Sequence, residues 1–171
     1  MFIRTKQGLI RRFFHLNNMT IGIIGFGSIG ERHFNNIRKL YPKCNLVIFT
    51  KRKDVSKQDN VLFFSSSRNF FKSKIDIFFI TNETYKHIPT LLQCLRYVPK
   101  GIFMEKPLSH TTKDLNVVEK IMKRQKTVFF VGYCLQFYAP FIELKTMVQT
   151  GQIGDVIFIR ASVGQDLRTW R

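Results

Sequence analysis

Residues 20–30 read Thr-Ile-Gly-Ile-Ile-Gly-Phe-Gly-Ser-Ile-Gly, an apolar run that leads into three glycines spaced as GxGxxG. The run predicts a buried strand at Thr20–Gly25, and the residues that follow predict a helix at Ser28–Leu40. This strand–turn–helix order is typical of a dinucleotide-binding site, because the helix N-terminus offers amide donors and a positive dipole to a pyrophosphate.

Each glycine of this turn has its own predicted task. Gly25 permits the tight turn, Gly27 lets a pyrophosphate approach the backbone, and Gly30 lets the helix pack closely against the strand. The residues between them complete the predicted cofactor-binding turn: Phe26, Ser28 and Ile29. Glycines at this spacing also serve ordinary tight turns, so the preceding strand and following helix are what favour cofactor binding.

The rest of the chain repeats the same alternation of short apolar runs and helical stretches. Further strands are expected at Asn45–Thr50, Val61–Phe64, Ile75–Thr81, Gly101–Glu105 and Thr127–Gly132. Further helices are expected at Ser67–Lys72, Thr84–Tyr97, Thr111–Arg124 and Phe137–Gly151. Several strands are continuously apolar, as a parallel sheet covered on both faces requires. The predicted fold class is therefore α/β, a doubly wound, mostly parallel Rossmann sheet.

Three segments are expected along the chain. Residues 1–19 form a basic N-terminal extension, which is either a non-structural segment before the first strand or a targeting arm. Residues 20–150 form the dinucleotide-binding domain. Residues 151–171 begin a further domain, with a strand expected at Asp155–Val163. If that strand had no partner, its open edge would promote self-association.

Composition narrows the class of protein. The 28 Lys and Arg residues against 11 Asp and Glu give a net charge of +17, which by itself would suit a nucleic-acid partner. The basic residues are spread over the whole chain, however, and no nucleic-acid-binding motif accompanies them, so nucleic acid is not the expected partner. No apolar stretch is long enough to span a bilayer, so no membrane partner is expected. Three widely spaced cysteines without a CxxC pair argue against a metal site and fit a cytoplasmic location.

The end of the second predicted strand bears on cofactor choice. An acidic residue at this place would bind the ribose 2′-hydroxyl of NAD, but the chain has Thr50, Lys51 and Arg52, and its first acid is Asp54. A hydroxyl and two cations suit the 2′-phosphate of NADP, so NADP is favoured over NAD. Alternatively, Lys51 and Arg52 lie on a solvated loop, which would leave the specificity open.

Two further strand ends carry polar residues toward the same crevice, because ligands of such sheets lie beyond the carboxyl ends of the strands. Asn82 either contacts a cofactor ribose or shapes a turn. His87 is either a donor to the ligand or a capped, half-buried structural histidine. Glu105 and Lys106 close an apolar parallel strand, where charges are costly unless they are paired or used, and this favours a functional role for both.

Four blocks of the chain resemble the Gfo/Idh/MocA oxidoreductases in order and spacing. They are GIIGFGSIGERHFNNI, FITNETYKHIPTLL, GIFMEKPLSHT and VGYCLQFYAPFIELKTMVQTGQIGDV, which together cover nearly all of residues 20–171. The resemblance implies hydride transfer between NAD(P) and a hydroxyl carbon of a sugar-like or nucleotide-sugar-like substrate.

The resemblance also implies roles for single residues. Lys106 would be the active-site lysine near the nicotinamide, Glu105 would line the nicotinamide ribose, and the Lys106–Pro107 bond would be cis. A second group would contact the cofactor: Thr81, Asn82, His87 and the Trp170–Arg171 pair.

The sequence departs from the family pattern in two ways. Gln136 stands where many members have arginine. Members also continue into a second domain that carries an Asp/His catalytic motif, which these 171 residues do not include. The sequence therefore predicts the cofactor half of such an enzyme, truncated, and a non-catalytic nucleotide-binding remnant is the alternative.

Overall fold

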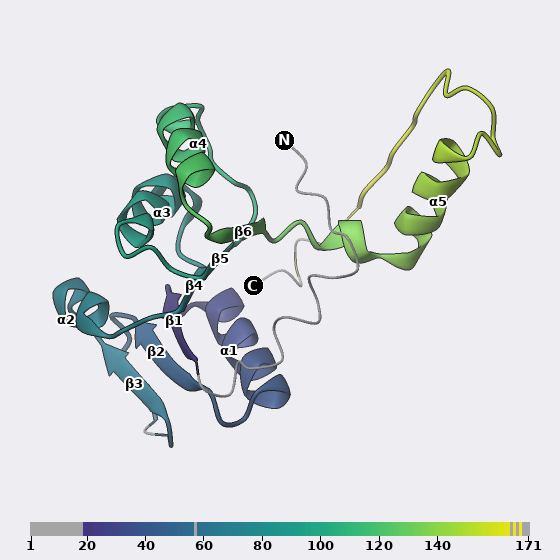
Figure 1. Ribbon diagram of the computed structural model, residues 1–171. Helices are drawn as coiled ribbons and strands as arrows, with labels where there is room; N and C mark the ends of the chain where they lie inside the picture. The colour runs from purple at the N-terminus through teal and green to yellow at the C-terminus, as the bar shows by residue number, and fades with distance from the viewer. Residues whose placement is uncertain (1–18, 57, 165, 167, 169–171) are drawn as a thin grey trace. The chain divides into compact units, whose positions relative to one another are not determined.

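Six strands build one parallel sheet in the order β3-β2-β1-β4-β5-β6 (Figure 1). The computed structural model describes residues 19–56, 58–164, 166 and 168. The strands are β1 (Thr20–Ile24), β2 (Asn45–Phe49), β3 (Val61–Phe64), β4 (Ile77–Ile80), β5 (Gly101–Met104) and β6 (Val128–Val131). Because β1 pairs with β2 on one side and with β4 on the other, the strand order reverses beside β1. In open α/β sheets such a reversal point is where ligands bind.

Helices cover both faces of this sheet, which confirms the predicted doubly wound class (Figure 1). They are α1 (Ser28–Leu40), α2 (Ser67–Lys72), α3 (His87–Leu95) and α4 (Leu115–Arg124), with a short 3-10 turn, η3 (Thr84–Lys86), before α3. On one face Phe34 and Ile37 of α1 pack on Ile21 and Ile23 of β1. Helices α2, α3 and α4 cover the other face, in a core centred on the fully buried Phe70.

Two of the expected helices that cover the sheet begin later than the sequence predicted. The helix expected from Thr84 starts as the 3-10 turn η3 and becomes α-helical only at His87. The helix expected from Thr111 starts at Leu115. There the backbone of Asp114 lies in the left-handed region, with φ of 62°, and a continuous α-helix cannot pass through that conformation.

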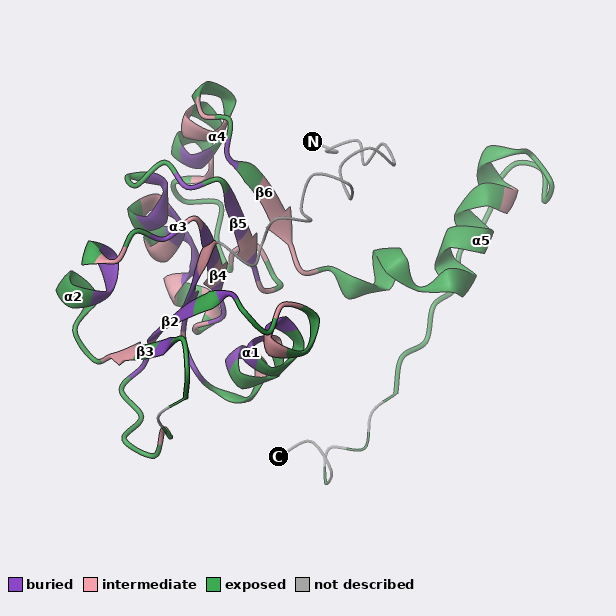
Figure 2. Cartoon of the chain, turned by 60° about the horizontal axis from the view of Figure 1, so that its bottom comes forward, coloured by how far each residue is buried: buried purple, intermediate pink, exposed green. Residues whose placement is uncertain are grey.

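The second unit of the chain begins after Tyr133 and is described by itself. It contains a 3-10 turn, η4 (Cys134–Phe137), and α5 (Ala139–Gln149), with a proline in the first turn of the helix. The strand expected at Asp155–Val163 is wrong, because residues 155–163 have no strand pairing and side chains such as Phe158 are 80% exposed (Figure 2). A strand needs a hydrogen-bonded neighbour, and the described part of this unit offers none. Among the helices of the described residues, none has the length and apolar character needed to cross a membrane.

Asp76 joins three strands at the amino edge of the sheet. Its Oδ2 accepts a hydrogen bond from the Thr20 amide at 3.0 Å, and its Oδ1 lies 2.7 Å from Nζ of Lys100. Its backbone carbonyl accepts the Lys100 amide at 2.8 Å. Partial burial would raise the pKa of this carboxyl, but the hydrogen bonds from Lys100 and Thr20 outweigh that effect, so the pKa lies below its ordinary value.

We expect Asp76→Asn to lower the free energy of unfolding at pH 7 by about 1–2 kcal/mol. Because the folded-state pKa is depressed, this contribution is present above the ordinary Asp pKa of 3.8 and is lost as the pH falls through the folded value. Urea unfolding at several pH values should therefore show the two proteins converging below pH 3.8. Glu83→Gln, which breaks an exposed ion pair with Lys86, is the control and should have a smaller effect. An Asp76→Asn deficit that persists unchanged in acid would contradict the account.

Candidate functional site

The turn between β1 and α1 lies at the carboxyl edge of the sheet, at the reversal point of the strand order. The Gly25 amide donates to the carbonyl of Phe49 at 3.1 Å, which ties the turn to the end of β2. Gly25 has φ of 94°, a left-handed conformation that glycine adopts without strain. A Cβ at Gly25 would also lie 2.6 Å from the Asn82 backbone nitrogen, so the turn packs directly on the chain that follows β4.

The three glycines of the turn differ in what surrounds them. A Cβ at Gly30 would overlap the carbonyl oxygen of Gly25, which means that α1 starts in direct backbone contact with the turn. A Cβ at Gly27, in contrast, would meet no atom of the described chain within 4 Å. Gly27 is also the N-cap of α1, and its side-chain position faces open space beside the first amides of the helix. The turn is therefore closed at Gly25 and Gly30 and open at Gly27.

Thr81 fastens this turn from the next strand. Its hydroxyl lies 2.6 Å from the Gly25 carbonyl oxygen and 3.1 Å from that of Ile24, and its amide donates to Ile24 at 2.9 Å. The side chain is buried. Because its hydroxyl proton is directed to these carbonyls, the structure gives Thr81 the task of holding the glycine turn.

Asn82 brings an unpaired acceptor to the same edge. Its Nδ2 donates to Oγ1 of Thr90 at 2.9 Å, whereas its Oδ1 is buried and has no hydrogen-bond partner among the described residues. A buried carbonyl oxygen without a partner is costly, and such atoms are usually satisfied by water or a ligand. A ligand hydroxyl beside Gly25 would satisfy it.

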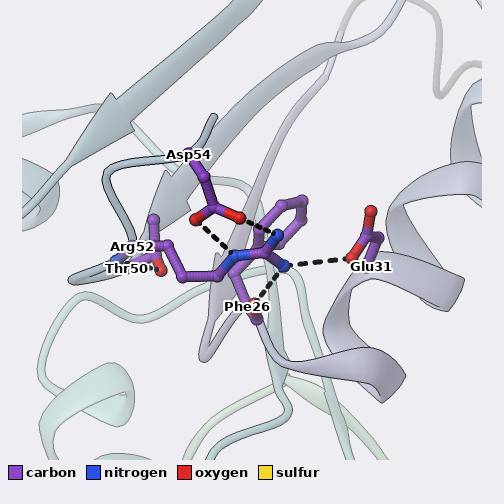
Figure 3. Close-up of polar contacts among 5 residues, drawn as sticks. All are labelled: Phe26, Glu31, Thr50, Arg52 and Asp54. Atoms are coloured by element: carbon purple, nitrogen blue, oxygen red, sulfur yellow. Dashed lines mark hydrogen bonds and ion pairs between the residues drawn. The ribbon is translucent and has the colours of Figure 1, made fainter. Parts of the chain in front are cut away.

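Arg52 lies beside the turn, held between two carboxylates (Figure 3). Its guanidinium binds Asp54 through Nε at 3.0 Å and Nη2 at 2.7 Å, while Nη1 lies 3.0 Å from Glu31 and 3.2 Å from the Phe26 carbonyl oxygen. The hydrogen bond from Arg52 lowers the pKa of Asp54 to about 2. The same bonds to Asp54 and Glu31 raise the pKa of Arg52. Arg52, the residue predicted to bind a 2′-phosphate, is thus already paired with two acidic side chains.

The other two residues of the predicted 2′-site lie around Arg52. Thr50 is buried at the end of β2, and its Oγ1 accepts the Arg52 amide at 3.1 Å. Lys51 is exposed. The sequence did not indicate that Asp54 and Glu31 pair with Arg52, and the contact with Glu31 joins residues 21 positions apart, which no local pattern indicates.

Glu105 and Lys106 follow β5, one strand beyond Asn82. The Glu105 carboxylate lies 2.8 Å from Nε2 of His33 through Oε1 and accepts the Lys106 amide at 3.2 Å through Oε2. Lys106 is exposed, and the Lys106–Pro107 bond is cis, as the resemblance implied. His33 was not predicted, although it lies one helical turn after Gly30 and therefore on the same side of α1.

His87 is buried at the start of α3, with 1% of its surface exposed. Its Nδ1 lies 2.8 Å from the Pro107 carbonyl oxygen, and its Nε2 lies 3.1 Å from that of Asn82. Both ring nitrogens are therefore engaged by the protein. Trp170 and Arg171, also predicted to contact the cofactor, lie outside the described residues.

These features fit a dinucleotide. The open position at Gly27 leaves room for a pyrophosphate at the N-terminus of α1, and the orphaned Oδ1 of Asn82 can accept from a ribose hydroxyl. A parallel sheet with the order β3-β2-β1-β4-β5-β6 and this turn after β1 defines a Rossmann dinucleotide-binding domain.

The comparison with family models gives a more specific classification. Residues 19–133 match the Gfo/Idh/MocA family, described as an oxidoreductase family with an NAD-binding Rossmann fold. The chain belongs to this family, and these residues are its NAD-binding domain.

Curated relatives include inositol dehydrogenases. Myo-inositol 2-dehydrogenase of Thermotoga maritima is 25% identical over 142 residues, which cover 80% of this chain and 42% of that protein. An inositol 2-dehydrogenase/D-chiro-inositol 3-dehydrogenase of Lacticaseibacillus casei is 26% identical, with 83% and 43% covered. The chain thus spans less than half the length of these relatives.

Solved structures share the fold. Myo-inositol 2-dehydrogenase from Lactobacillus plantarum superposes with a TM-score of 0.71 at 21% identity, covering 82% of this chain and 43% of that one. The WlbA dehydrogenase from Chromobacterium violaceum, solved in complex with NADH and UDP-GlcNAcA, gives a TM-score of 0.71 at 19% identity, with 81% and 41% covered.

Proposed function

We propose that this chain is the cofactor-binding part of an oxidoreductase that moves a hydride between a nicotinamide cofactor and a hydroxyl carbon of a sugar-like substrate. The observation that carries the proposal is the turn that is open at Gly27 and closed by backbone at Gly25 and Gly30. Such a turn leaves space at Gly27, beside the first amides of α1, where a phosphate can approach the backbone. The named activities of the inositol dehydrogenases and the NADH complex of the WlbA dehydrogenase support the same reading.

In this proposal the pyrophosphate lies against Gly25–Gly30, and Asn82 accepts from a ribose hydroxyl. The bound nicotinamide supplies the hydride acceptor. Lys106, exposed at the mouth of β5, acts in this proposal as the neutral amine: its Nζ accepts a hydrogen bond from the substrate hydroxyl and takes that proton, becoming an ammonium, as the carbon is oxidised. Residues 151–171, with Trp170 and Arg171, belong in this proposal to the beginning of a substrate and dimerisation domain.

Titration of the 171-residue chain with NADH tests the proposal. We expect saturable binding by calorimetry, accompanied by a change in the fluorescence of the bound dihydronicotinamide. Lys106→Ala should alter that bound fluorescence while retaining most of the affinity, because the proposed pyrophosphate contacts at Gly25–Gly30 do not involve Lys106. Absence of binding to the folded wild-type chain would reject the proposal. Unchanged fluorescence in Lys106→Ala would remove Lys106 from the nicotinamide site.

The choice between NAD and NADP is proposed to be a competition for Arg52. A 2′-phosphate beside Arg52 would have to replace a carboxylate that the guanidinium already binds, and Asp54 makes two of those bonds. Asp54 is also the more exposed of the two acids, at 71% against 48% for Glu31. Asp54 is therefore the partner that Arg52 gives up to NADP.

We expect Asp54→Asn to strengthen NADPH binding about threefold, the size of effect that one exposed ion pair allows. NADH affinity should stay the same, because NADH has no 2′-phosphate to compete for Arg52. Parallel calorimetric titrations of the variant and the wild type measure both values. Lys53→Gln, a charge change on the same exposed loop, is the control. Equal gains for NADH and NADPH would refute the competition.

A further inference from the structure

Lys106 is flanked on both sides by hydrogen bonds to histidines from different helices. The residue before it, Glu105, binds His33 of α1, and the carbonyl of the residue after it, Pro107, binds His87 of α3, each at 2.8 Å. We propose that His33 and His87 are positioning residues that fix the Glu105–Pro107 segment and thereby present Lys106 at the carboxyl edge of the sheet. The inference rests on the proposed function, in which Lys106 meets the nicotinamide and the substrate.

The His33 ring is fixed by its packing. Its centroid lies 4.8 Å from that of Phe103 and 5.6 Å from that of Phe79, so the ring is held over the strands β5 and β4. The side chains of His33 and Glu105 are only 18% and 13% exposed. A carboxylate so far out of water needs a donor, and His33 supplies it to Oε1. The other oxygen of Glu105, Oε2, accepts a hydrogen bond from the Lys106 amide. The position of His33 on α1 therefore restrains the backbone of Lys106 through Glu105.

His87 constrains the other side of Lys106. Its two partners, the carbonyl oxygens of Pro107 and Asn82, accept hydrogen bonds but do not donate them. The imidazolium form satisfies both, whereas the neutral ring satisfies one. Through Asn82, whose backbone packs on Gly25, this link also reaches the glycine turn. The two histidines thus fix the position of Lys106 relative to the proposed pyrophosphate site.

The test compares His33→Phe with His33→Gln. Phenylalanine keeps the packing against Phe79 and Phe103 but has no donor for Glu105. Glutamine places its Nε2 amide near the position of the histidine Nε2 and restores the donor. His110→Phe, an exposed histidine in the loop after Pro107, is the control. All variants are measured in the full 171-residue chain, with thermal unfolding to show that each is folded.

Two measurements are made on each variant. The first is the ¹H–¹⁵N resonance of the Lys106 amide and its hydrogen-exchange rate, and the second is the dissociation constant for NADH. In His33→Phe we expect the Lys106 amide to shift and to exchange about tenfold faster, the factor for loss of about 1.4 kcal/mol of protection. NADH should bind about fivefold more weakly, within the cost of one misplaced hydrogen-bonded contact. His33→Gln should recover most of both values, and His110→Phe should change neither.

A Lys106 amide that is unchanged in His33→Phe, or equally disturbed in His33→Gln, overturns the inference even if NADH binds. A wild-type chain that binds no NADH rejects the proposed function instead, and the amide measurement still decides the positioning role. His87 is tested in the same way by His87→Asn, whose Nδ2 can replace Nδ1 as the donor to Pro107, against His87→Leu. If both are folded, only His87→Leu should disturb the Lys106 amide, and equal effects would remove His87 from the pair.

Discussion

Gly27→Val is expected to weaken NADH binding at least about 100-fold, equivalent to about 2.7 kcal/mol, while the domain stays folded. The backbone of Gly27 has φ of −83° and ψ of −168°, an extended conformation that valine adopts readily. No described atom lies within 4 Å of the new Cβ, so the folded chain accepts the side chain. The branched side chain would instead occupy the space proposed for the pyrophosphate. Calorimetric titration with NADH and urea unfolding measure the two effects separately.

Some loss of stability accompanies this change, because valine is a poor N-cap. We expect the free energy of unfolding to fall by about 1 kcal/mol. Gly27→Ala, with a single methyl group, is the matched control and should give an intermediate affinity. If Gly27→Val binds NADH as well as the wild type, the pyrophosphate does not lie at this turn.

Gly30→Ala is expected to show the opposite pattern, a loss of stability of about 3 kcal/mol, as overpacking of a tight contact produces. The added Cβ would overlap the carbonyl oxygen of Gly25 and approach the Thr81 hydroxyl to 3.0 Å. The Thr81 hydroxyl and the Gly25 carbonyl are also joined by a hydrogen bond, so neither can move away freely. The helix would have to move away from the turn. Urea unfolding in the absence of cofactor is the measurement.

Gly101→Ala serves as the control for Gly30→Ala. The nearest atom to a Cβ at Gly101 is a backbone oxygen at 3.7 Å, which is ordinary van der Waals contact. We expect the stability of that variant to lie close to the wild-type value, because the site accepts a methyl group. Equal stability of Gly30→Ala and Gly101→Ala would mean that α1 does not depend on the close approach at Gly30.

The sequence predicted the sheet well because most residues of its central strands β1, β2 and β4 are buried. Continuous apolar runs such as Ile77–Ile80 have few alternative structures once they are bounded by polar residues and glycines. The predicted strands extended one residue too far at Thr50 and Thr81. The local sequence does not distinguish the last residue that pairs with a neighbouring strand from the residue that follows it. The strand at Asp155–Val163 failed for a different reason: high strand propensity does not supply a pairing partner.

The site was predictable only where one segment forms it. The GxGxxG turn is local, so its geometry follows from the order of residues 25–30. Thr81 and His87 were predicted to contact the cofactor, but their polar side-chain atoms instead contact backbone carbonyls 56 and 20 residues away in the chain. The contact of His33 with Glu105 crosses 72 residues and joins α1 to the end of β5. Such distances along the chain leave no periodic signal.

The position of β1 in the middle of the sheet also determines how the chain can assemble. In the register of β1 with β4, Ile21 pairs with Ile77. This central contact therefore cannot form until the intervening elements α1, β2, β3 and α2 have been synthesised. Contacts between residues so far apart must overcome the loop-closure entropy before they contribute energy, which makes parallel α/β sheets slow to fold. While the chain is being synthesised, the stage at which only β1, α1 and β2 have emerged from the ribosome still leaves the edge of β1 that pairs with β4 exposed. The central contact of the sheet is therefore expected to form late, after β4 has been synthesised, and the core on the α2–α3–α4 face is completed only by the elements that follow β4.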